Sequence, residues 1–183
     1  MYPSKIALLS VGLYQNKKLI TMQKITPFLW FNGNAEEATN FYTGIFNNSK
    51  VVSINRMPGQ EPGQQGPVFS TVFELEGQTF YAMNGGPQFS FTPAISLFVN
   101  CKTQQEVDEL WEKLTADGGK EDRCGWLTDK FGLSWQIIPE QLGQYMADKD
   151  PAKSGRVMQA LMGMGKLDIQ ALTDAYNGVG AEA

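Results

Sequence analysis

The chain has 183 residues, of which 42% are hydrophobic and 19% charged, a composition typical of one globular domain or of two small modules sharing a core. The net charge is −4, and no Lys/Arg cluster extends beyond Lys17-Lys18, so neither nucleic acid nor a membrane surface is expected as a partner. The chain has no histidine and no Cys-x-x-Cys pair, which argues against a histidine-ligated metalloenzyme and against structural zinc. Its two cysteines, Cys101 and Cys124, are expected to be free thiols in a reducing compartment.

The first 21 residues differ in character from the rest. Residues 6–14 form an apolar run after Lys5 that is too short to span a bilayer, and no small-x-small cleavage site follows it. We interpret residues 1–21 as a dispensable extension of a cytoplasmic protein. A cleaved export signal is the alternative.

The next part of the chain predicts a strand, a helix and three more strands. Residues 25–31 are rich in β-branched and aromatic side chains, and Asn34 can cap a helix that carries apolar residues at helical spacing up to Phe46. The loop 58–67 consists of turn formers and glutamine, and Gly77 marks a tight turn. The three strands are expected at residues 49–57, 67–76 and 78–83.

The same pattern then recurs. A strand is expected at 94–101, and Thr103 can cap a second helix that ends at Asp117-Gly118-Gly119. Asn32 aligns with Asn100, and Phe41-Tyr42 align with Leu110-Trp111, which indicates an internal duplication of a βαβββ unit. Short strands follow near 120–124, 126–128 and 134–139, and three helices follow near 142–146, after Pro151 and after Asp168.

This order of elements, with its local motifs, resembles the vicinal-oxygen-chelate (glyoxalase/bleomycin-resistance) superfamily, and within it the PhnB-like proteins, whose domain is often described as 3-demethylubiquinone-9 3-methyltransferase. The resemblance covers about Met22 to Gly178, and the ordered set of motifs is specific although each one alone is weak. The segments that carry it are Ile25-Thr-Pro-Phe-Leu-Trp-Phe31, Asn34-Ala-Glu-Glu-Ala38, Asn40-Phe-Tyr42, Asn84-Gly-Gly-Pro87, Cys124-Gly-Trp126, Asp129-Lys-Phe-Gly132, Ser134-Trp-Gln136, Val157–Met162 and Lys166-Leu-Asp-Ile169.

The resemblance implies an α+β fold in which two βαβββ modules form a cup-shaped mixed sheet, with C-terminal helices added. The glyoxalase-like domain would span 22–140, with modules at 22–90 and 91–140, and residues 141–183 would form a helical extension. A homodimer is expected, because members of this superfamily are often dimers and the C-terminal helices could supply an apolar interface.

The resemblance also locates the positions at which metal-dependent relatives carry their ligands. Spacing from Asn40-Phe-Tyr42, from Asn100 and from Asp129-x-x-Gly132 places them at Pro27, Ala94 and Gln136, while a fourth position near Tyr81 or Met83 stays open. Proline and alanine offer no donor atom, and a neutral amide is a poor ligand for a transition metal. We therefore expect no metal and no cofactor, and if the protein is an enzyme, not a conventional metal-dependent glyoxalase or dioxygenase.

A cup without metal would bind by shape and by hydrogen bonds. Strand alternation places Leu29 and Phe31 on the face of Pro27, and Ser96 and Phe98 on that of Ala94, with Trp30, Leu97, Val99, Trp135 and Ile137 pointing at the helices. The candidate ligand-binding residues are Gln136, Tyr81, Leu29, Phe31, Phe98 and Trp126.

Structural alternatives remain for several of these positions. Gln136 is either a ligand-orienting amide or a paired buried one, and Trp126 is either a cup wall or a core indole. Arg56 either meets a carboxylate ligand or lies on a solvated sheet edge. Cys124 as a nucleophile is disfavoured, because without histidine the activating setting is hard to build.

Three functions follow. We expect metal-independent binding of a small apolar or aromatic molecule in the cup. One alternative is an enzyme, which would act on a quinone-like substrate, as the methyltransferase description suggests, or would have a glyoxalase/dioxygenase-like activity. The other alternative is a dimeric regulatory or structural protein.

Overall fold

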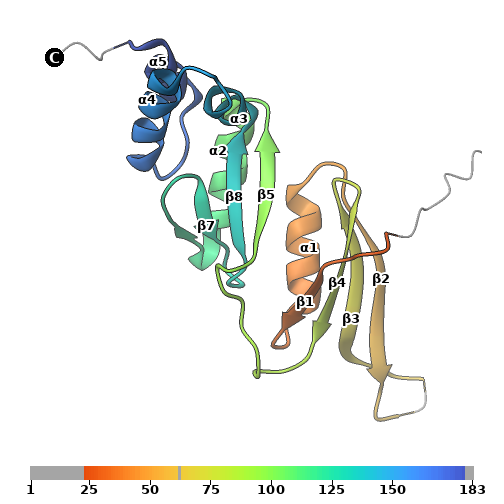
Figure 1. The fold of residues 1–183 in the computed structure, drawn as a ribbon. Helices are drawn as coiled ribbons and strands as arrows, with labels where there is room; N and C mark the ends of the chain where they lie inside the picture. The colour runs from red at the N-terminus through yellow and green to blue at the C-terminus, as the bar shows by residue number, and fades with distance from the viewer. Residues whose placement is uncertain (1–22, 62, 180–183) are drawn as a thin grey trace, which may run out of the picture.

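A computed structural model describes residues 23–61 and 63–179, so the interpretation of residues 1–21 falls outside the part that the structure describes. Figure 1 shows two βαβββ modules side by side, followed by three helices packed at the far end of the second module. The elements are β1 (Phe28–Phe31), α1 (Ala35–Ile45), β2 (Lys50–Pro58), β3 (Gln65–Leu75), β4 (Gln78–Asn84), β5 (Ser96–Cys101), α2 (Gln104–Thr115), a short 3-10 turn (Ala116–Gly118), β6 (Lys120–Glu121), β7 (Trp126–Thr128), β8 (Ser134–Pro139), α3 (Glu140–Met146), α4 (Pro151–Met162) and α5 (Ile169–Asn177).

The two modules have the same topology. The strand orders are β1-β4-β3-β2 and β5-β8-β7-β6, and in each module the first strand is parallel to its neighbour while the other neighbours are antiparallel. The predicted α+β class and the duplicated βαβββ unit are therefore confirmed. The two sheets stay separate in the described residues, so β1 and β5 are each a free sheet edge instead of neighbours in one continuous sheet.

At the ends of two elements the structure differs from the sequence prediction. Asn34 precedes α1, but its side chain makes no capping hydrogen bond; the Oδ1 atom of Asn84, at the end of β4, accepts one from the backbone N–H of Ala35 at 2.9 Å. The expected strand at 120–124 is shorter, because Cys124 adopts a positive φ of 58° and turns the chain before Trp126.

The second helix begins as its sequence predicts. The Thr103 hydroxyl accepts a hydrogen bond from the N–H of Glu106 at 3.2 Å, and the Glu106 carboxylate accepts one from the N–H of Lys102 at 2.7 Å. This reciprocal pair satisfies backbone donors that a helix N-terminus otherwise leaves unpaired. The predicted Asp168 cap of α5 is also confirmed, with the N–H of Ala171 as donor at 2.8 Å.

One buried carboxylate joins the two modules. Asp129, in the turn between β7 and β8, is 3% exposed and accepts hydrogen bonds from the Tyr42 hydroxyl of α1 and the Trp135 indole N–H of β8, both at 2.8 Å. Its other oxygen accepts from the backbone N–H groups of Phe131 and Leu133 at 2.9 and 3.0 Å. Burial raises the pKa of Asp129, while these four hydrogen bonds lower it, so the carboxylate is fully paired.

The helix α1 lies between the two sheets in Figure 1, and a shared core forms around it. Phe46 stacks on Trp135, and the β7–β8 turn packs on α1, where Lys130 pairs with Glu37 at 2.9 Å and lies 5.0 Å from the centroid of the Phe41 ring. Aromatic side chains from both modules thus bury one continuous interface.

The C-terminal helices form a second, smaller core together with Ile138, which lies near the end of β8. Gln104 of α2 joins the C-terminal segment to the second module. Its amide N–H donates to the carbonyl of Leu167 at 3.0 Å, and its amide oxygen accepts from the N–H of Ile169 at 2.8 Å. A side chain at Gly125 would lie 2.9 Å from the carbonyl oxygen of Ile137, so this contact with β8 requires glycine. None of the helices described is long and apolar enough to cross a membrane.

We predict that Tyr42→Phe lowers the free energy of unfolding by about 2 kcal/mol, because the buried Asp129 carboxylate loses one of its four donors. Tyr81→Phe is the matched control, because Tyr81 is 41% exposed, and the same change there should cost less than about 0.5 kcal/mol. Urea unfolding followed by tryptophan fluorescence measures both. Equal stability of the two variants would contradict the role of Asp129 as the link between the modules.

Candidate functional site

Three of the predicted site residues lie in one row across the second sheet. Phe98 of β5 is the register partner of Gln136 in β8, and Gln136 is the register partner of Trp126 in β7. Cross-strand partners point to the same face, and here that face is opposite the core, since the neighbouring Trp135 and Ile137 are 1% and 0% exposed. We call Phe98, Gln136 and Trp126 the aromatic–amide row.

The amide at the centre of the row is only partly paired. Gln136 is half-buried, and its Nε2 donates to the Ser96 hydroxyl at 2.8 Å. Within the described residues its carbonyl oxygen accepts no hydrogen bond. The amide orientation is therefore fixed by Ser96 while an acceptor remains for a partner from outside the chain.

Tyr81 lies on the other sheet. It is the register partner of Phe28, and the two rings stack with their centroids 6.1 Å apart on the face of the first sheet that is opposite α1. Both rings are exposed, Phe28 at 58% and Tyr81 at 41%. Within one chain the structure therefore does not bring Tyr81 to Gln136.

The predicted orientation of the first strand was wrong. Leu29 and Phe31 are 7% and 3% exposed and pack in the core on the α1 side, whereas Phe28 and Trp30 point the other way. The Trp30 indole N–H donates to the carbonyl of Gly86 at 2.8 Å, a partner that it would lose if the strand turned over. Leu29 and Phe31 are core residues, and neither lines an exposed face.

The three positions inferred for metal ligands lie on three different segments. Ala94 is exposed and precedes β5, Pro27 lies before β1, and Gln136 stands on the open face of the second sheet. Among the described residues no group of three or more His, Cys, Asp or Glu side chains could hold a metal ion. The donor atoms at these three positions thus do not fit a transition-metal centre.

A groove of about 750 Å³ runs between the two modules. Pro27 and Phe98 are among its lining residues, which are more apolar than polar, and Glu76, Lys102 and Glu106 are the charged ones. Phe98 belongs to both the groove and the aromatic–amide row, so the groove adjoins the row at β5. Its other apolar lining residues are Phe46, Leu75, Phe80, Leu97, Val99 and Trp135.

Sequence reasoning missed the groove residues Phe46 and Phe80, because they belong to the end of α1 and to β4, and nothing local shows that these elements face β5. It also missed the exposure of Phe28. All four residues of β1 are apolar, so no local signal in the sequence could have shown which of them face outward.

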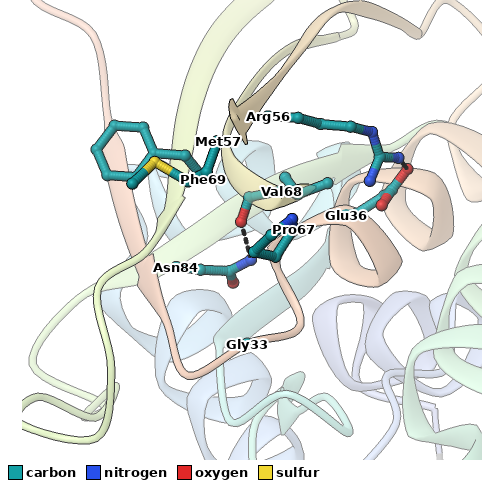
Figure 2. Close-up of a pocket in the computed structure, with 8 residues that line it drawn as sticks. All are labelled: Gly33, Glu36, Arg56, Met57, Pro67, Val68, Phe69 and Asn84. Carbon is teal, nitrogen blue, oxygen red and sulfur yellow. Dashed lines mark hydrogen bonds and ion pairs between the residues drawn. The ribbon is translucent and has the colours of Figure 1, made fainter. Parts of the chain in front are cut away.

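Two other candidates have structural partners. Arg56 of β2 donates from Nη2 to the Glu36 carboxylate of α1 at 2.6 Å, in the hollow drawn in Figure 2. The Cys124 thiol lies 3.5 Å from the carbonyl oxygen of Leu161, while burial, and then Glu106 and Glu140, raise the pKa of the Cys101 thiol to about 12. Burial keeps Cys101 protonated and unreactive at neutral pH.

A protein-family model described as 3-demethylubiquinone-9 3-methyltransferase matches residues 23–138. The chain belongs to this family. The matched residues contain both modules, and the helices α3 to α5 lie beyond them. A search of curated proteins gave no match.

Solved structures agree with the assignment. A PhnB protein from Bacillus cereus is 43% identical, with a TM-score of 0.58, and the alignment covers 64% of this chain and 99% of that one. Protein PA1353 from Pseudomonas aeruginosa is 21% identical, with a TM-score of 0.51 over 62% of this chain and 94% of its own, which shows a shared fold. The predicted resemblance to PhnB-like proteins is confirmed.

Proposed function

We propose that this family member binds a small aromatic molecule without a metal, at the aromatic–amide row and the adjoining groove. The observation that carries the proposal is the half-paired amide of Gln136, held by Ser96 between the aromatic side chains of Phe98 and Trp126. An apolar site with a few fixed polar atoms is the usual form of a small-molecule site.

The geometry favours a ligand with a hydroxyl group on an aromatic ring. The ring would pack against Phe98 and Trp126, and the hydroxyl would donate to the unpaired amide oxygen of Gln136. A phenol or a hydroquinone has this chemistry, whereas a purely apolar molecule would leave the amide oxygen desolvated without a partner. Phenol-type recognition is thus the form in which we propose the binding of an aromatic molecule that the sequence led us to expect.

The row supports binding better than turnover. Acid–base catalysis needs a titratable group within hydrogen-bond reach of the proton that moves. The row and its hydrogen-bonding partner Ser96 contain no carboxylate, thiol, tyrosine or lysine, and the charged groups of the site, Glu76, Lys102 and Glu106, belong to the groove. The methyl transfer named in the family description therefore has no general base among the residues of the row.

We also propose that the working form is a homodimer. The edges β1 and β5 carry unpaired backbone groups, and the stacked Phe28 and Tyr81 rings expose apolar surface beside the β1 edge. Exposed sheet edges with apolar side chains beside them can pair with another chain. A second copy of this chain could cover both edges, because its two modules present the same pair of edges again.

For the binding site, we predict that Gln136→Ala weakens 1-naphthol binding about tenfold, since one hydrogen bond to a fixed acceptor is lost. The wild-type chain should also bind 1-methoxynaphthalene about tenfold more weakly than 1-naphthol, because the ether has no hydrogen to donate. Isothermal titration with excess chelator present throughout measures both.

Gln105→Ala is the matched control, because Gln105 is a glutamine of α2 whose side chain, within residues 23–61 and 63–179, hydrogen-bonds only to Glu109 on the surface of that helix. It should leave both affinities unchanged. Tight 1-naphthol binding that survives Gln136→Ala, or that disappears with the chelator, would contradict the proposed site.

For the assembly, we predict that light scattering after size exclusion gives about twice the 20.3 kDa mass of the chain. Phe28→Lys should give the monomer mass, because a charge at the β1 edge opposes burial there. Val52→Lys is the control, since Val52 is 51% exposed on β2 at the other edge of the same sheet and should leave the dimer intact. A monomeric wild-type chain would contradict the proposed dimer. It would not bear on the proposed binding site, which the 1-naphthol titration tests separately.

A further inference from the structure

A second hollow, separate from the proposed binding site, lies where α1 begins. It has a volume of about 620 Å³, and β2, β3 and the N-terminal end of α1 supply its walls. It shares no lining residue with the inter-module groove or with the aromatic–amide row. Nothing in the proposed function uses it.

One wall of the hollow is apolar and open. Met57 and Phe69 are 49% and 45% exposed, and Figure 2 shows them together, across the hollow from the side chains of Arg56 and Glu36. The ladder between β2 and β3 shifts register on both sides of Arg56, which locally disrupts the pairing beside these two side chains. These two exposed apolar side chains give the hollow a surface against which an apolar ring can pack.

The opposite wall is an ion pair that is only partly satisfied. A single hydrogen bond, from Arg56 Nη2 to Glu36 Oε1, joins the two groups, whose side chains are 33% and 35% exposed. An arginine has five N–H donors and a carboxylate can accept at both oxygens. In the described residues this pair therefore keeps free donors on Arg56 and a free acceptor on Glu36, side by side and with no net charge.

The floor of the hollow is held in place by hydrogen bonds within the chain, before any ligand binds. The Asn84 side chain donates to the carbonyl of Val68 and accepts from the N–H of Ala35, both at 2.9 Å, so it ties β4 to β3 and to the start of α1 (Figure 2). With both ends of the amide occupied, Asn84 holds the two walls in place. A preformed site loses less free energy to ordering when a ligand binds.

We propose that this hollow binds a neutral carboxamide attached to a small apolar ring. The carbonyl of the ligand would accept from Arg56, its N–H would donate to Glu36, and the ring would pack against Met57 and Phe69. A carboxylate would gain Arg56 but meet the like charge of Glu36, and an ammonium group would gain Glu36 but meet Arg56, whereas a neutral amide can pair with both groups without repulsion from either.

The test is a titration of the isotopically labelled full chain with benzamide, benzoate and benzylamine, followed by amide NMR shifts. Benzamide should give saturable shifts at Gly33, Phe69 and Asn84, with an affinity at least about tenfold higher than that of either charged probe, since one charge-assisted hydrogen bond is at stake. Equal affinities for the three probes, no saturable shifts, or shifts confined to the aromatic–amide row would overturn the proposal.

Arg56→Met and Phe69→Ala should each weaken benzamide binding by about tenfold. Lys50→Met is the matched control, because Lys50 lies on the same strand and pairs with Glu74 at 3.1 Å at the surface, away from the hollow. Gln136→Ala should also leave the benzamide affinity unchanged, which separates this site from the proposed phenol site. Benzamide binding that is insensitive to Arg56→Met in a chain with an otherwise native spectrum would overturn the proposal.

Discussion

The structure depends on how the buried carboxylate of Asp129 is paired. An ionised carboxylate away from water is strongly destabilising unless donors surround it, and here a tyrosine of the first module, a tryptophan of the second and two backbone N–H groups supply them. Because Tyr42 and Trp135 belong to different βαβββ units, the carboxylate can be satisfied only when the two units are docked. Burial and the Asp129 charge raise the pKa of Tyr42 well above its usual value, so its hydroxyl stays a donor.

The same pairing positions the candidate site. Trp135 points inward to reach Asp129, and side chains alternate along a strand, so the next residue, Gln136, must point outward on the open face. The register of β8 with its two neighbours then places Phe98 and Trp126 beside it. A structural constraint in the core thus determines which side chains meet on the surface.

Much of the architecture could be predicted from the sequence. The duplicated unit, the helix caps at Thr103 and Asp168, and the inward orientation of Trp135 and Ile137 follow from local patterns that the structure confirms. The sequence could not predict which residues of β1 face the core, because all four residues from Phe28 to Phe31 are apolar and neither face of the strand is polar. The hydrogen bond from Trp30 to Gly86, 56 residues away in the chain, helps to fix the orientation of the strand. The replacement of the expected Asn34 cap by Asn84, the groove between the modules and the hollow at Arg56 likewise depend on contacts between distant segments.

The most direct test of the account is a crystal structure of the chain with 1-naphthol, grown with manganese and recorded with anomalous scattering. The account predicts density for the ring between Phe98 and Trp126, with the ligand hydroxyl donating to the Gln136 amide oxygen and no manganese peak beside it. A manganese ion coordinated by side chains of this polypeptide at the ligand, or a naphthol bound away from Gln136, would contradict it.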